Sequence, residues 1–179
     1  GNVEVSQRLV DTLLLAFEAA ACSQGTMNNF VMGDYARSYY ETIGGGAGAG
    51  EGFAGASGVH VHMSNTAITD PEILEWRFPV RLNRFCLRVG SGGEGRWNGG
   101  DGLEREIEFL EPQTVSLLGQ HRLEQPYGMN GGKKGACGSQ TIIRADGTEE
   151  ALGFAAHTEV KKGDRLVIKT PGGGGYGGH

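Results

Sequence analysis

The sequence predicts an α+β chain in which one N-terminal amphipathic helix precedes a predominantly antiparallel, glycine-rich β structure. Three observations support this prediction. A long run of apolar residues at helical spacing occurs near the start, and later apolar residues alternate with polar ones, as in strands. Glycine contributes 33 of the 179 residues, in clusters without a triplet repeat. That distribution excludes collagen and favours tight turns between short strands.

The expected helix spans residues 6–24. Leu9 and Leu13 belong to its apolar stripe, Ser6 is suited to the N-cap position, and Gly25 is suited to the position just beyond the last turn. An amphipathic helix is stabilised mainly by burial of its apolar face. The stripe therefore needs a partner, which is either the body of this domain or chain upstream of it.

The β-rich body is expected over residues 57–177. The patterns predict strands at 57–65, 79–89, 103–110, 114–122 and 164–169, and a hairpin within 140–154. The alternation slips at Asn83 and Arg84, which predicts a bulge. Asp146 followed by Gly147 predicts a two-residue hairpin turn. Between the first two strands, residues 69–76 predict a short helix with Thr69 or Asp70 as its cap and Pro71 in its first turn.

Composition excludes several classes of protein. The net charge is −5 and the lysines and arginines form no basic stripe, so nucleic-acid binding is not expected. No apolar run approaches the roughly 20 residues of a membrane span. The three cysteines form neither a CxxC pair nor a disulfide framework, which favours a reducing, cytoplasmic location. The chain starts at Gly1 rather than methionine, so we expect residues 1–179 to be a single piece of a longer protein.

Common catalytic motifs are absent from the sequence. GxGxxG occurs at 90–95 and at 172–177, but neither stretch leads into a helix that could hold a dinucleotide pyrophosphate. There is no GxxxxGK[ST] phosphate loop and no GxSxG serine elbow. Catalytic residues therefore stay unassigned.

His60 and His62 are the best local candidates for a site. On a strand their side chains would point the same way, so they could share a metal or hold a small anionic substrate, with Asn65 and Thr66 adding hydrogen-bonding groups. The alternative is that both histidines lie on the solvated face of a strand. Further metal ligands would have to come from distant residues among which no spacing selects: Asp70, Glu72, His121 and His157.

Four consecutive glycines follow the last expected strand: Gly172, Gly173, Gly174 and Gly175. Ordering such a run costs more backbone entropy than ordering any other residues, so it is either a loose tail or a place where the backbone comes very close to something else. No helix or cation nearby suits a phosphate. We expect a tight backbone crossing packed against another segment.

Taken in order, five segments strongly resemble the C-terminal part of the hydantoinase B/5-oxoprolinase family, and most closely its ATP-dependent 5-oxoprolinases. The segments are 6–29, 39–52, 57–112, 126–138 and 170–177. The resemblance covers nearly the whole chain. It implies an enzyme that opens the lactam of 5-oxo-L-proline to L-glutamate, coupled to ATP hydrolysis.

The resemblance also implies partners and cofactors. ATP would be bound by a hydantoinase A-type domain or subunit, any divalent metal would be held by the upstream part of the same domain, and no metal is expected on this piece. The full enzyme would be an oligomer, and this piece would be inactive alone. The residues to watch, by motif, are His60, His62, Asn65 and Thr66 as substrate-binding candidates, with Gly172–175 as the close-approach loop.

The chain departs from the expected oxoprolinase pattern in three places: 35–38, 119–122 and 153–155. If the family's basic residues at those sites contact anions, the substrate differs. The alternatives are an N-methylhydantoinase, a related ATP-dependent carboxylase subunit, or a non-catalytic scaffold or interface module.

Overall fold

The computed structural model describes residues 3–178 and confirms the α+β class: an N-terminal helix precedes a largely antiparallel β structure, and a second, short helix lies between two of its strands. In chain order the elements are α1 (Val3–Ala16), β1 (Asn29–Gly33), β2 (Ser38–Thr42), α2 (Pro71–Arg77), β3 (Val80–Arg88), β4 (Gly102–Phe109), β5 (Gln113–Leu118), β6 (Ser139–Ile143), β7 (Glu149–Leu152), β8 (Ala155–Val160) and β9 (Arg165–Lys169).

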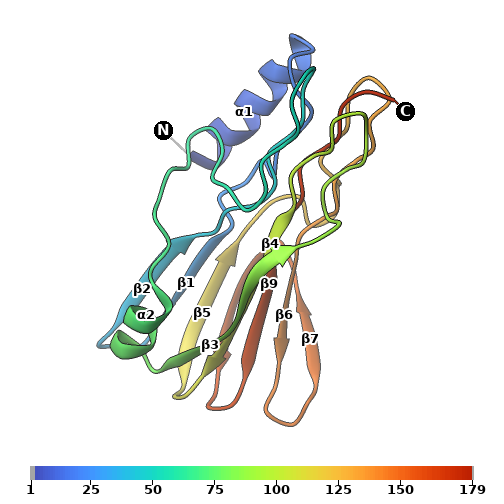
Figure 1. The fold of residues 1–179 in the computed structure, drawn as a ribbon. Coiled ribbons are helices and arrows are strands. Elements are labelled where there is room, and N and C mark those ends of the chain that lie inside the picture. Colours follow the sequence, from blue (N-terminus) through green and yellow to red (C-terminus); the bar gives the residue numbers. More distant parts are fainter. Residues whose placement is uncertain (1–2, 179) are drawn as a thin grey trace.

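Two sheets enclose the main hydrophobic core. One has the strand order β2-β1-β5-β8 and the other the order β3-β4-β9-β6-β7, with antiparallel neighbours throughout. The core side chains alternate along strands of both sheets and include Phe30 of β1, Val115 of β5, Ile107 of β4 and Leu166 of β9. Figure 1 shows the strands gathered at one end of the molecule, with α1 and long, nearly strandless loops at the other.

Several local predictions are confirmed. Asp70 caps α2 by accepting hydrogen bonds from the amides of Glu72 and Ile73, with Pro71 as the first helical residue. The register of β3 against β4 shifts between Leu82 and Arg84, where a bulge was expected. β6 and β7 form the predicted hairpin at Asp146 and Gly147, but its turn is longer than the expected two residues, because the amide of Arg144 donates to the carbonyl oxygen of Thr148 across residues 145–147.

Other boundaries were wrong. The helix expected over 6–24 is α1, which starts at Val3 and ends at Ala16. Residues 17 and 18 form a closing turn, in which Glu18 has a left-handed backbone, and residues 19–24 continue as a loop. Residues 57–65 contain only an isolated bridge between Val59 and Gly45, not a strand. The β structure also begins earlier than residue 57, because β1 and β2 precede it.

The apolar stripe of α1 does not face the body of the domain. The helix turns a polar face toward the domain: Gln7 and Asp11 are buried, whereas Leu9, Leu13 and Phe17 are exposed. Both sets of residues recur at helical spacing, so periodicity alone could not choose between them. Hydrogen bonds to loop residues, rather than apolar contacts, fix α1 on the domain.

The long loops pack backbone to backbone in a glycine-rich bundle around Gly172–175. The amides of Gly172 and Gly175 donate to Ala136 and Lys133 of one neighbouring segment, while those of Gly173 and Tyr176 donate to Gly100 and Trp97 of another. Each neighbour thus meets every third residue, which is the period of a polyproline II-type helix.

A side chain on any of the four glycines would collide with a neighbouring main chain. A Cβ at Gly172 would lie 1.9 Å from the carbonyl oxygen of Ser91, and one at Gly174 would lie 1.9 Å from that of Tyr127. A small second core of Ala21, Ala49, Met129 and Tyr176 closes this end of the molecule. The four glycines therefore lie at the centre of the bundle, as a packing element.

Candidate functional site

A buried polar cluster joins α1 to the glycine-rich loops. Asp11 Oδ1 lies 2.9 Å from Nε2 of His62 and accepts from the hydroxyl of Ser23 at 2.9 Å and its amide at 3.1 Å. Burial by itself would raise the pKa of Asp11, but the hydrogen bond and charge of His62, together with Ser23, outweigh it and lower that pKa. Asp11 is therefore an ionised anchor between three segments.

The three residues have the composition of a Ser-His-Asp triad but not its geometry. A triad uses one imidazole nitrogen for the serine and the other for the carboxylate. Here the same atom, Nε2 of His62, lies 3.0 Å from Ser23 Oγ and 2.9 Å from Asp11 Oδ1. If Nε2 took the proton of Ser23, Asp11 would not lie at the opposite nitrogen, Nδ1, where a triad carboxylate stabilises the charged imidazole. The arrangement is therefore suited to holding the loops together.

A second histidine lies beside this cluster. His121 has a left-handed backbone with φ +53°, and its Nδ1 lies 2.8 Å from the carbonyl oxygen of Glu124. That contact requires a proton on Nδ1, which leaves Nε2 to accept from Arg8 and, at 3.7 Å, from the thiol of Cys22. Burial lowers the pKa of His121, and the positive charge of Arg8 lowers it further. His121 is thus held neutral.

Cys22 is not an activated nucleophile. Its side chain is fully buried, and burial raises the pKa of the thiol, with the charge of Asp11 acting in the same direction. A reactive cysteine instead needs a depressed pKa and access to solvent. Its contact with His121 is therefore a packing and hydrogen-bonding contact.

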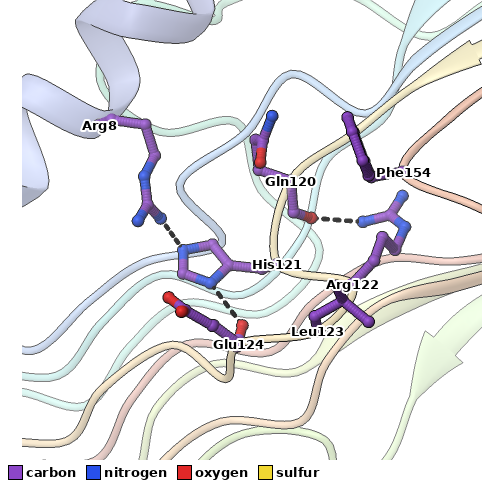
Figure 2. Close-up of a pocket in the computed structure, with 7 residues that line it drawn as sticks. All are labelled: Arg8, Gln120, His121, Arg122, Leu123, Glu124 and Phe154. Carbon is purple, nitrogen blue, oxygen red and sulfur yellow. Dashed lines mark hydrogen bonds between the residues drawn. The ribbon is translucent and has the colours of Figure 1, made fainter.

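A pocket of about 350 Å³ opens next to His121. We call it the Arg122 pocket; it is lined by Arg8, Gln120, His121, Arg122, Leu123, Glu124 and Phe154. Figure 2 shows Arg8 approaching from α1 on one side, while Arg122 and Phe154 lie on the other. Residues 120–122 and Phe154 belong to two of the three segments in which the sequence departs from the expected family pattern.

The histidine candidates do not come together as expected. His62 has φ +54° and is engaged by Asp11 and Ser23, whereas His60 Nε2 lies 3.3 Å from Thr66 Oγ1. Thr66 in turn contacts the hydroxyl of Thr42, and Asn65 is exposed. Nδ1 of His60 is buried without a hydrogen-bond partner, and burial lowers the pKa of this residue.

The residues considered as metal ligands from the sequence do not come together as a metal site. Asp70 caps α2, and His157 Nδ1 lies 2.8 Å from the hydroxyl of Ser116 on the neighbouring strand. Within residues 3–178, no group of three or more His, Cys, Asp and Glu side chains is placed to hold a metal ion. Over the same residues, neither helix is long and apolar enough to cross a membrane.

His60 and His121 make stability depend on pH. Their pKa values are lowered from 6.5 in the folded state, so the unfolded chain binds more protons in the window below about pH 6.5. The contribution of the two neutral histidines to the free energy of unfolding is therefore complete above that pH, and the free energy of unfolding should fall as the pH drops through the window. Urea unfolding between about pH 8 and about pH 5.5 measures this slope.

The matched control for that slope is His121→Asn, because asparagine tolerates the left-handed backbone but does not titrate. The variant should show a shallower loss of stability on acidification than the parent chain. An identical slope in both proteins would contradict the assignment of a neutral, buried His121.

A family model described as hydantoinase B/oxoprolinase matches residues 1–179, and the chain belongs to the hydantoinase B/oxoprolinase family. It is 54% identical over 177 residues to 5-oxoprolinase 1 of Arabidopsis thaliana and 48% identical over 177 residues to 5-oxoprolinase of Dictyostelium discoideum. Each alignment covers 99% of this chain but only 14% of the relative.

Two solved structures share the fold. The ATP-dependent caprolactamase from Pseudomonas jessenii superposes with a TM-score of 0.77 at 26% identity, over 93% of this chain and 32% of that one. A nucleotide-free acetone carboxylase gives a TM-score of 0.72 at 17% identity, over 96% of this chain and 29% of that one. The chain is thus similar to one part of two much larger proteins, an ATP-dependent caprolactamase and an enzyme of ATP-dependent acetone carboxylation.

Proposed function

We propose that this chain is the C-terminal part of a 5-oxoprolinase-type amidohydrolase, which couples ATP hydrolysis to opening of the 5-oxo-L-proline lactam to L-glutamate. The observation that supports the proposal most strongly is the 54% identity to a 5-oxoprolinase over 99% of the chain. Because the chain spans 14% of that relative, the rest of the catalytic apparatus is proposed to lie outside it.

We propose no nucleotide or metal site on this part of the protein. The sequence has no phosphate loop, and the part of the chain seen in the structure offers no set of three metal-ligating side chains. From the resemblance to the family, ATP is proposed to bind to a hydantoinase A-type domain or subunit, and any divalent metal to the upstream part of the same domain. The full enzyme is proposed to be a cytoplasmic oligomer, and the isolated chain to be inactive.

His60, Asn65 and Thr66 remain our proposed substrate-binding residues on this part of the domain. Nδ1 of His60 is a buried polar atom without a partner, and Asn65 next to Thr66 is accessible. His62 was proposed with them, but its contacts with Asp11 and Ser23 suit it better to fixing the loop that presents the other three.

The test is an assay of the intact protein that carries this chain. We expect ATP-dependent release of glutamate from 5-oxo-L-proline, and no turnover by residues 1–179 alone. Hydantoins and acetone, each with ATP, are the comparison substrates. Turnover of only those two would assign the protein to an N-methylhydantoinase or a carboxylase, and nucleotide hydrolysis by the isolated chain would contradict the proposed division of labour.

A scaffold or interface role is the second candidate. It is supported by the Asp11, Ser23 and His62 cluster, whose hydrogen bonds are satisfied internally and join three segments. His60→Ala in the intact protein separates the two, because the residue is not part of that cluster. A loss of kcat/KM with unchanged folding supports a substrate role, and unchanged activity supports a scaffold.

A further inference from the structure

Arg122 brings a positive charge into the wall of the Arg122 pocket and forms no ion pair with a carboxylate of residues 3–178. Its nitrogens donate to the carbonyl oxygen of Gln120 at 2.7 Å, to Asn28 Oδ1 at 3.0 Å and to Gln140 Oε1 at 3.2 Å, all of them neutral acceptors. The carboxylate that attracts it most, that of Glu4, already accepts from Thr26 and from the amide of Met27.

Arg105, a buried arginine of the same domain, differs from Arg122 because a carboxylate balances its charge. Arg105 is 1% exposed and lies 2.8 Å from Oε1 of Glu41, so a buried anion balances its charge. Removing a guanidinium from water is costly unless such compensation is present. Arg122 lacks it, and burial lowers its pKa to about 10. The positive potential at this wall therefore stays available to a ligand.

The surrounding chain is shaped to hold Arg122 in place. A Cβ at Gly119 would lie 2.6 Å from Nη2 of Arg122, and a Cβ at Gly138 would lie 2.5 Å from Nη1. Glycine at both positions leaves the space that the planar guanidinium occupies. A side chain lying loosely on the surface would not need this space.

The two amide acceptors of Arg122 are also fixed in orientation. Asn28 donates through Nδ2 to Gln24 and to the carbonyl oxygen of Ile43, and Gln140 donates through Nε2 to the carbonyl oxygen of Gly153. Their oxygens must therefore face Arg122, which pre-organises the cation for binding.

We propose that the Arg122 pocket binds a small cyclic carboxylic acid, whose carboxylate lies against Arg122 and Arg8 and whose ring packs on Phe154. The exposed guanidinium of Arg8 can meet a planar carboxylate in geometry and charge, whereas Arg122, whose nitrogens already donate to neutral acceptors, contributes mainly its charge. Arg8 is exposed, lines the same pocket and forms no ion pair within the described residues. A volume of about 350 Å³ suits a molecule of this size.

Glu124 adds selectivity to this site. Its carboxylate also lines the pocket, so a ligand with one carboxylate is favoured over a ligand with two. A lactam acid has one carboxylate and its ring-opened product has two. The proposal deepens the proposed function and rests on it only for the identity of the acid, which is then 5-oxo-L-proline.

Calorimetric titration of the intact protein without nucleotide tests the proposal. The probes are 5-oxo-L-proline and 2-pyrrolidinone, which is the same ring without the carboxylate. We expect the acid to bind at least about tenfold more tightly than the neutral lactam, and Arg122→Gln to remove this preference. Arg77→Gln, at an exposed arginine at the end of α2, is the matched control and should bind like the parent.

Arg8→Gln is the second variant, for the case in which Arg122→Gln does not fold, because Arg8 is exposed. Arg8→Gln should weaken binding of the acid by about fivefold and leave binding of 2-pyrrolidinone unchanged. Equal binding of the two probes, or an acid affinity unchanged in both folded variants, overturns the proposal. If the acid binds but is not turned over with ATP, the proposed function is wrong and the binding proposal stands. If 5-oxo-L-proline is turned over with the same KM in the Arg8 and Arg122 variants as in the parent, the binding proposal is wrong and the proposed function stands.

Discussion

Gly173→Val is expected to abolish the folded protein. A Cβ at this position would lie 1.9 Å from the carbonyl oxygen of Ala47 and 2.8 Å from the amide of Gly48. Gly173 cannot move away, because its amide donates to Gly100 and its carbonyl oxygen accepts from Gly93, both at 2.8 Å. The cost is at least about 3 kcal/mol, a large share of the stability of a typical domain. Soluble yield and urea unfolding measure it.

Gly178→Val is the matched control, since a Cβ there has no neighbour within 4 Å. It should unfold at the same urea concentration as the parent chain. If Gly173→Val also did so, the close-packed glycine bundle would be contradicted.

Glu41→Leu should destabilise the protein by about 3–5 kcal/mol, because it leaves the buried guanidinium of Arg105 without its counter-charge. The ion pair bridges the two sheets, from β2 to β4, and the hydroxyl of Tyr39 donates to the same carboxylate. Burial raises the pKa of Tyr39 to about 12, so it stays protonated and also loses its acceptor in this variant. Equilibrium urea unfolding gives the difference in free energy.

The double variant Glu41→Leu/Arg105→Met tests the cause. Removing both charges together should recover most of the lost stability, since no unpaired ion is left in the core. Lys133→Gln breaks the exposed pair with Glu94 and should change little. A double variant as unstable as Glu41→Leu alone would show that lost packing, rather than an uncompensated charge, causes the effect.

Local chemistry made parts of the fold predictable. Asp70 and Pro71 specify the start of α2, and Asp146 with Gly147 specifies a hairpin turn, because these residues act through their own backbone or one a few positions away. The strict alternation of β4 likewise follows from one face lying on the core. These patterns require no knowledge of distant segments.

The candidate site was harder to predict, because it depends on contacts between distant segments. The 57–65 segment alternates like a strand, yet His62 turns into a left-handed conformation to reach Asp11 and Ser23. The Arg122 pocket combines α1, residues 120–124 and Phe154, and only the departures from the family pattern at 119–122 and 153–155 pointed toward it.

The sequence by itself determined the α+β class, the family and the turns and caps, because these depend on residue order and short-range hydrogen bonds. The tertiary structure decided which face of α1 is buried, where the four glycines lie and which cations share a pocket. The physical reason is that each of these depends on contacts between residues far apart in the chain, such as Gly173 with Ala47 or Arg122 with Asn28.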